Sequence, residues 1–416
     1  MKPKLLTTLP AYTSRLLAAD VIAGITVAMV ALPLSIAIAI ASGAPPAAGL
    51  VTAVIGGLIV SALGGSRVQI GGPTGAFIVV VYGIIQQFGF DGLLLATLMA
   101  GLILIIGAVV QAGRLIALIP EPVIEGFTIG IAVIIAVSQL KDLLGESIAQ
   151  MPAEFVDIVP VLWSARGTIN VAALAIGLAT IVLILMLRRW TPRIPGSILA
   201  IAIASGAVAL LALPVDTLHS RFGSLPNGIP MIALPPMSTE LLIALLPSAL
   251  VIAFLAGVES LLSAVVADRM IGGAHRSNAE LLAQGAANIA SPLFGGLPVT
   301  GAIARTATNV RAGGRTPIAG IVHALTILVV IVAAAPLAAY LTMPALAGLL
   351  IVTAWTMSEP DRWPERLRAS ASDRILLFLT FGLTVLSSLT VAIAIGTALG
   401  LAIQLQKRIL ASDSCP

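Results

Sequence analysis

The sequence predicts an all-α polytopic membrane protein. Of its 416 residues, 59% are hydrophobic and only 10% are charged, and the mean hydropathy is +1.10, whereas a soluble domain carries about 25% charged residues. The apolar residues form long continuous runs, which are typical of transmembrane helices and not of the shorter, alternating strands of a membrane barrel. Gly- and Pro-rich sequences interrupt one such run in each half of the chain. At about 20 residues per helix, this length allows roughly twelve to fourteen crossings.

The first half of the chain contains seven predicted crossings, separated by Gly- and Pro-rich turns. The third crossing should be a short extended piece followed by a half-helix, because Gly71-Gly72-Pro73 interrupts it and Pro suits the first turn of a helix. The crossings cover approximately residues 21–41, 47–63, 68–88, 92–112, 123–140, 169–187 and 195–213. Residues 1–213 are the predicted first repeat, within which the mixed residues 141–168 form a partly amphipathic connection.

The second half repeats this organisation after a Pro-rich linker, residues 214–237. Its crossings cover approximately residues 238–268, 280–293, an interrupted segment that ends near 313–314, 317–334, 337–357, 374–388 and 390–405. Residues 238–410 are the predicted second repeat, and 411–416 are a tail. Seven crossings in each half is an odd number, so the two halves should be inverted relative to each other in a 14-segment, 7+7 arrangement.

The distribution of basic residues predicts the orientation of the chain in the membrane. Most lysines and arginines fall on the side of the N-terminus, whereas Lys141, Arg166 and Arg221 fall on the opposite side. Cytoplasmic segments carry an excess of Lys and Arg, and the first apolar run is too long for a cleavable signal peptide. We therefore expect a multi-pass protein of the cell (inner) membrane with both termini in the cytoplasm.

The two interruptions share the sequence Thr-Gly-Ala, at residues 74–76 and 300–302. Helices broken at membrane depth leave N–H groups that lipid cannot satisfy, so such breaks occur inside protein or beside a polar cavity. If the two half-helices point at one place, each presents about half a positive charge there, and free N–H groups of residues 74–76 and 301–303 would bind an anion. The alternative interpretation is that Gly and Pro only kink two packed helices.

Arg305 follows the second interruption by one helical turn. An intramembrane Arg usually faces a cavity or a charged partner, so we interpret it as attracting a substrate anion. Two alternatives stay open, namely a structural ion pair with a carboxylate and a side chain that extends to the cytoplasmic interface.

Glu259 lies deep in an apolar sequence, and Ser263 follows four residues later on the same helix face. A carboxyl group removed from water favours its neutral form, so Glu259 could load a coupling proton. Glu259 and Ser263 could instead supply oxygens to a sodium ion, or Glu259 could form a permanent ion pair with Arg305.

The chemistry of other function classes is missing from the sequence. No cluster of His, Cys, Asp and Glu has metal-ligand spacing, and no phosphate loop, nucleophile elbow or pair of catalytic carboxylates is present. We therefore expect no metal, no cofactor and no catalytic residues, and hence not an enzyme. His323 is alone in an apolar run and is interpreted as a packed core residue. The net charge of +4 indicates cytoplasmic Lys and Arg beside membrane lipid, not a nucleic-acid partner.

At several motifs the chain resembles the SulP family of sulfate-permease-like anion transporters. The resemblance covers almost the whole length. Its most specific pieces are residues 31–37 (ALPLSIA), 71–75 (GGPTG), 259–268 (ESLLSAVVAD) and 295–298 (GGLP) with Arg305.

This resemblance implies a core domain and a gate domain, an anion held between the third and tenth crossings, an elevator-like motion and a homodimer. It implies that Leu34 and Ile38 form an apolar wall and that Glu259 occupies the ion-coupling position. Most members also carry a cytoplasmic STAS domain. Because this sequence ends soon after the last expected crossing, we expect no STAS domain in it, and either a natural absence or a truncated sequence would account for this. Together with the interruptions, the expected substrate-binding residues are Thr74, Gly75, Ala76, Thr300, Gly301, Ala302, Ile303, Ala304, Arg305, Leu34 and Ile38.

The resulting hypothesis is secondary active transport of a small anion, such as sulfate, bicarbonate or a small dicarboxylate, by symport with a proton. Alternatives on the same fold are a sodium-coupled bicarbonate symporter, an uncoupled anion exchanger or channel, and a nucleobase transporter. The last should have a carboxylate or polar side chain after the second interruption, and residues 300–304 offer none.

Overall fold

The computed structural model describes residues 2–113, 120–148, 151–190, 195–226, 228–387, 391–392, 395–400 and 402–403. Seven helical segments in these ranges are long and apolar enough to cross a membrane, and an eighth apolar helix is shorter. The long segments contain α2 (Ser14–Ala41), α3 (Pro46–Leu63), α4 (Ile78–Val109), α6 (Glu121–Ser138), α9 (Val171–Trp190), α12 (Thr239–Ile271) and α15 (Pro317–Ala338), and the shorter helix is α10 (Gly196–Leu211).

The other helices are shorter, and several lie in predicted connections. The α-helices among them are α1 (Lys4–Thr8), α7 (Leu140–Leu144), α8 (Phe155–Ala165), α11 (Leu218–Phe222), α13 (Ser277–Leu293), α14 (Ile303–Arg311), α16 (Met343–Met357), α17 (Trp363–Arg368) and α18 (Ala371–Leu386). The 3-10 helices are η1 (Leu9–Ala11), η2 (Gly75–Phe77), η3 (Arg166–Thr168) and η4 (Pro360–Arg362), and the strands are β1 (Gly71–Gly72) and β2 (Thr300–Gly301).

Most predicted crossings correspond to one of these helices. The predicted third and fourth crossings both lie within α4, which consists of two helices that meet at Gly89, where φ is +73° and ψ is 178°. A glycine adopts this left-handed conformation without the steric cost of a Cβ. The predicted crossing at 390–405 lies partly outside the described residues and the tail 411–416 wholly outside them, so the count of fourteen stays a prediction.

Local sequence signals explain where several helices begin. Pro occupies the first turn of α3, α6, α15 and α16, where its missing N–H would have no helical partner anyway. The hydroxyl of Ser238 accepts the N–H of Leu241 at the start of α12, and Thr316 caps α15 in the same way. Asp20 of α2 accepts the hydroxyl of Thr316, which joins the start of α15 to α2.

The helices pack as two groups. The first bundle consists of α2, α3, α4, α12, α13, α14 and α15, which contact one another extensively, as in the pairs α13–α4, α12–α4 and α15–α2. The second bundle consists of α6, α7, α9, α10, α16 and α18, with close pairs such as α18–α6 and α16–α9. Contacts of α2 with α16 and α10, and of η2 with α6 and α16, join the two bundles.

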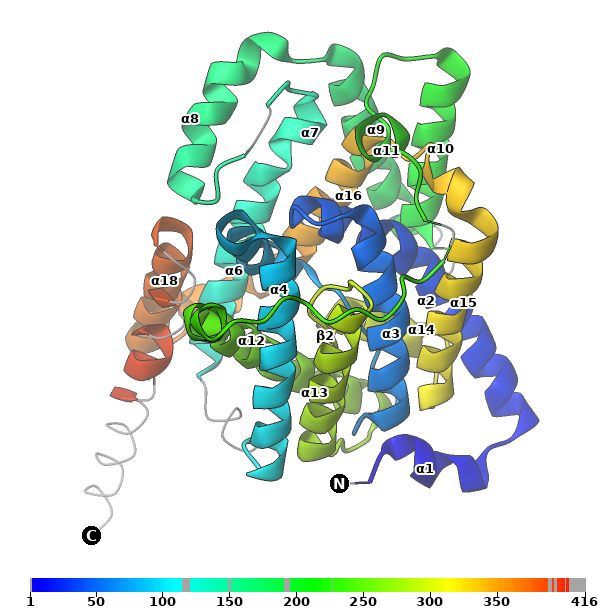
Figure 1. Ribbon diagram of the computed structural model, residues 1–416, viewed down its shortest axis with the longest axis vertical. Helices are drawn as coiled ribbons and strands as arrows, with labels where there is room; N and C mark the ends of the chain where they lie inside the picture. Colours follow the sequence, from blue (N-terminus) through cyan, green and yellow to red (C-terminus); the bar gives the residue numbers. More distant parts are fainter. Residues whose placement is uncertain are drawn as a thin grey trace.

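A two-stranded antiparallel sheet lies at the centre of the first bundle. Gly71 pairs with Gly301 and Gly72 with Thr300. Figure 1 shows β2 near the middle of the molecule, with the N-terminus and α1 toward one end and α7, α8 and α11 toward the other. The two interrupted segments, which are far apart in the sequence, therefore meet inside the protein.

Candidate functional site

The junction of β1 and β2 requires glycine on both strands. A Cβ at Gly301 would stand 1.6 Å from Gln69 Nε2, and a Cβ at Gly72 would stand 2.3 Å from Arg305 Nη1. Gly72 also has a φ of +152°, which L side chains rarely adopt. The glycines therefore let two backbones and two polar side chains approach one another closely at this point.

A helix begins just after each strand. η2 starts at Gly75 and leads into α4, while α14 starts at Ile303. The first N–H groups of a helix lack intrahelical acceptors, and this end carries the positive side of the helix dipole. One predicted donor is already used, because the Ala302 N–H donates to the Ile70 carbonyl at 2.9 Å. The expectation of a free N–H at Ala302 is therefore wrong in this conformation.

Arg305 reaches from the first turn of α14 across to the first interruption. Its Nη2 donates to the carbonyl of Pro73. The side chain is 2% exposed, and its Nε and Nη1 have no hydrogen-bond partner among the described residues. Burying a cation without full pairing is costly. The predicted extension to the cytoplasmic interface is not observed, and the N–H groups of Nε and Nη1 are available to donate hydrogen bonds to the oxygens of an anion.

Glu259 of α12 faces the first interruption. Its Oε2 accepts a hydrogen bond from Thr74 Oγ1 at 2.9 Å. In the described part of the chain, the ion pairs do not include one between Glu259 and Arg305. The structure therefore does not support the alternative in which Glu259 and Arg305 form a permanent ion pair.

Ser263 does not share a partner with Glu259. Its hydroxyl lies 3.2 Å from that of Thr306 in α14, and Thr306 Oγ1 accepts the N–H of Ile70 at 3.1 Å. Ser263 thus joins α12 to the two interruptions as a structural contact. No group of three or more His, Cys, Asp or Glu that could hold a metal occurs in the residues that the structure describes.

The other predicted site residues differ in how accessible they are. The hydroxyl of Thr300 donates to the Ala256 carbonyl at 3.1 Å and is fully buried. A Cβ at Gly75 would stand 3.0 Å from Met357 Sδ of α16, so this helix start faces the second bundle. Ile303 and Ala304 are exposed, Ala76 and Leu34 are half-buried, and Ile38 is buried in α2. Their contact with a ligand stays a prediction.

A buried polar network supports the junction, and the sequence analysis did not identify it. Gln69 Nε2 donates to Ser260 Oγ at 2.7 Å, and Ser260 Oγ donates to Glu280 Oε1 at 3.1 Å. All three side chains are at most 4% exposed. The only available signal was that these polar residues occur in strongly apolar surroundings, which indicates burial with partners but does not name them.

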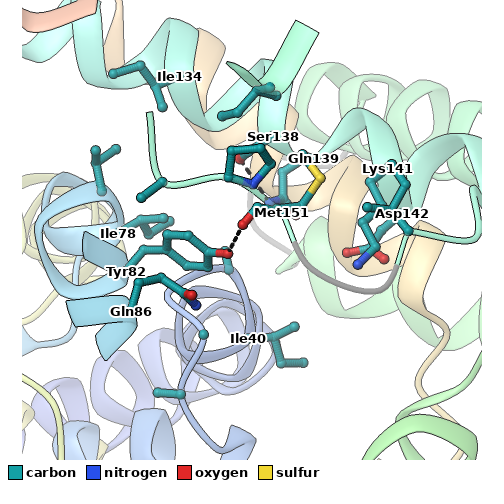
Figure 2. A pocket seen from close by; sticks show the side chains of 18 of the residues that line it. Ile40, Ile78, Tyr82, Gln86, Ile134, Ser138, Gln139, Lys141, Asp142 and Met151 are labelled. Carbon is teal, nitrogen blue, oxygen red and sulfur yellow. Dashed lines mark hydrogen bonds between the residues drawn. The ribbon is translucent and has the colours of Figure 1, made fainter. Parts of the chain in front are cut away.

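A separate cavity of about 680 Å³ lies between the two bundles (Figure 2). Residues of α7 and α11 line part of it, and Figure 1 shows these helices at the end of the molecule away from α1. Its lining includes Ile40 at the end of α2, Ile78 and Tyr82 of α4, and Lys141 of α7. Figure 2 shows the Tyr82 hydroxyl donating to the Met151 carbonyl at 2.5 Å, which links α4 to the connection after α7. Neither Arg305 nor Glu259 lines this cavity.

The fold and the junction define a class of protein, a helical membrane transporter in which two broken segments meet inside one bundle. The structure is similar to that of the transmembrane domain of a cyanobacterial bicarbonate transporter, BicA, with a TM-score of 0.83 and 30% identity over 92% of this chain and 98% of that one. It is also similar in fold to SLC26A9, with a TM-score of 0.88 and 18% identity over 97% of this chain and 68% of that one.

The sequence comparisons identify the family. The model of the sulfate permease family matches residues 17–380. A putative sulfate transporter of Bacillus subtilis, YvdB, is 43% identical over 382 residues, which are 91% of this chain and 72% of the relative. The bicarbonate transporter BicA of a Picosynechococcus strain is 31% identical over 91% of this chain and 68% of its own length. The chain therefore belongs to the sulfate permease family, whose members are multi-pass membrane transporters and not enzymes.

Proposed function

We propose that this protein is a secondary active transporter of a small anion, which is held where β1 and β2 meet. The observation that supports this most is the buried guanidinium of Arg305, which lies near the N-termini of two helices. Its Nε and Nη1 have no hydrogen-bond partner among the residues that the structure describes. Backbone N–H groups and a buried cation together favour an anion. The names of two relatives, a putative sulfate transporter and a bicarbonate transporter, support sulfate or bicarbonate as the substrate. A small dicarboxylate is a further candidate.

We further propose that Glu259 couples transport to a proton. Its Oε2 meets the Thr74 hydroxyl at the start of the first half-helix, so a change in its protonation would act directly on the anion site. Sodium is the alternative coupling ion. The hydroxyl of Ser263 is engaged with Thr306 and not with Glu259, which favours the proton.

The proposed movement is an elevator-like displacement of the first bundle, as core domain, against the second bundle, as gate domain. Rigid-body movement of one bundle around a fixed site is a common route to alternating access. The antiparallel pairing of β1 with β2 supports two inverted repeats of seven crossings, residues 1–213 and 238–410 joined by 214–237. A homodimer in the inner membrane with cytoplasmic termini completes this proposal.

Uptake into proteoliposomes tests the proposal. Sulfate, bicarbonate, fumarate and chloride are offered at two pH values, with and without a sodium gradient, and uracil is added as a competitor. We expect anion uptake that is driven by an inward proton gradient. Flux that responds to no ion gradient would instead support an exchanger or channel, sodium dependence would support the sodium symporter, and competition by uracil would support a nucleobase transporter.

The Glu259→Gln variant tests the coupling residue. The amide keeps an oxygen that can accept the Thr74 hydroxyl but cannot take up and release a proton, so uptake should lose its dependence on the proton gradient. Glu240→Gln is the matched control, because Glu240 is an exposed acid in the first turn of the same helix. Unchanged gradient dependence in Glu259→Gln would remove this residue from the coupling role.

A further inference from the structure

Glu280 of α13 is a buried acid that the proposed transport chemistry does not use. Its side chain is 0% exposed, and no ion pair among the described residues includes it. Instead, its two carboxylate oxygens accept four hydrogen bonds. A carboxylate needs several donors when no cation accompanies it into the protein interior. The origin of these donors indicates what Glu280 holds together.

Two donors come from the loop that leads from α3 into β1. The N–H groups of Gly65 and Ser66 donate to Glu280 Oε2 at 2.9 and 3.2 Å. The Arg276 N–H, just before α13, donates back to the Gly65 carbonyl at 3.0 Å. A Cβ at Gly65 would stand 2.1 Å from the Arg276 carbonyl oxygen, so only glycine permits this approach. The carboxylate therefore fixes the segment that enters the first interruption.

The other carboxylate oxygen is connected through α12 to Gln69, which precedes β1 and lies against Gly301 of β2. Glu280 Oε1 accepts the Ser260 hydroxyl and the Gln284 amide, each at 3.1 Å. Ser260 Oγ in turn accepts Gln69 Nε2 at 2.7 Å. The Gln69 amide occupies the space that a side chain at Gly301 would need. A continuous chain of hydrogen bonds thus runs from Glu280 through Ser260 of α12, the residue after Glu259, to the Gln69 amide, which packs against the strand junction.

We propose that Glu280 is a positioning residue, which holds the entry to the first interruption, the Glu259 turn of α12 and the strand junction in one fixed arrangement. This inference rests on the proposed function, because the arrangement it fixes is the anion site. Glu280 touches neither the proposed anion nor the coupling proton. Its effect on transport is through the placement of Thr74, Glu259 and Arg305 relative to one another.

The Glu280→Gln variant tests this inference by transport kinetics. The amide has the same shape but turns an NH2 group toward one of the two donor pairs, which disrupts half of the network. We expect the KM for the transported anion to rise by about ten-fold or more, because small displacements of binding groups have large effects. A purely structural role would lower the amount of active protein, and hence Vmax, without changing KM. Glu240→Gln is the control and should match the wild type.

Hydrogen–deuterium exchange provides a readout that does not depend on transport. Glu280→Gln should exchange faster than the wild type at residues 64–72 and 298–302, and Glu240→Gln should not. Unchanged exchange together with an unchanged KM would overturn the inference. If the wild-type protein transported no anion, the proposed function would be refuted but the inference about Glu280 would not. The exchange measurement would still decide whether Glu280 holds these segments in place.

Ser260→Ala covers the case in which Glu280→Gln does not fold. This change removes the link between Glu280 and Gln69 and leaves the other three donors to the carboxylate in place. We expect a smaller rise in KM in the same direction and faster exchange at residues 64–72. A folded Ser260→Ala protein with wild-type KM and wild-type exchange would contradict the inference.

Discussion

At the scale of single residues, the candidate site depends on the Arg305 guanidinium, for which the described part of the protein supplies hydrogen-bond acceptors only in part. Arg305 Nη2 donates to the Pro73 carbonyl, and in the described part of the protein its Nε and Nη1 have no hydrogen-bond partner. Glu259, the nearest proposed carboxylate, is directed to Thr74 instead. An Arg that was needed only for stability would be expected to carry a paired carboxylate. The arrangement leaves charge available for an anion.

The Arg305→Gln variant tests this reading. Removing a hydrogen bond between charged groups costs about 1.5–3 kcal/mol, so the KM for the anion should rise by about ten- to one-hundred-fold. Arg311→Gln is the control, because Arg311 lies on the same helix but is exposed. Proteoliposome uptake at matched protein density gives both values. An equal KM in the two variants would show that the Arg305 charge does not contribute to binding.

At the scale of elements, the sequence predicted the two interruptions because Gly and Pro leave a local signature. Gly71-Gly72-Pro73 and the repeated Thr-Gly-Ala indicated an extended piece before a half-helix, and β1, η2 and α14 have this arrangement. Sequence could not name the side chains that join the pieces. Gln69 and Ser260 are 191 residues apart, and no local pattern encodes such a pairing. The sequence also predicted that Ser263 acts together with Glu259, whereas its hydroxyl contacts Thr306 of α14. Spacing along one helix shows which residues share a face, but it does not show which residues of other helices contact them.

The Gly301→Ala variant tests the requirement for close approach at the junction. The new methyl group would overlap the Gln69 amide, and such overpacking typically costs about 1–3 kcal/mol. Tm in detergent should therefore fall and anion uptake should be lost. Gly83→Ala serves as the control, since a Cβ there meets nothing within 4 Å and Ala favours a helix. If Gly301→Ala had the stability and uptake of the wild type, the two strands would not need to be this close.

At the scale of the whole molecule, the proposed anion site and its supporting network belong to the first bundle, and the second bundle faces the proposed site. Composition alone predicted a helical membrane protein, because 10% charged residues cannot cover a soluble surface of this size. The division into bundles could not be read from the sequence, because α2 and α15, or α6 and α18, come from opposite halves and pack together. This division is what makes relative movement of the bundles a physically reasonable proposal.

Anomalous diffraction from crystals soaked in selenate, a tetrahedral analogue of sulfate, tests the central claim most directly. We expect a selenium peak beside the β1–β2 junction, with selenate oxygens within hydrogen-bond distance of Arg305 Nε or Nη1. An ordered peak elsewhere, such as in the cavity lined by Lys141, with none at Arg305, would contradict it. So would an empty junction in crystals of protein that takes up sulfate.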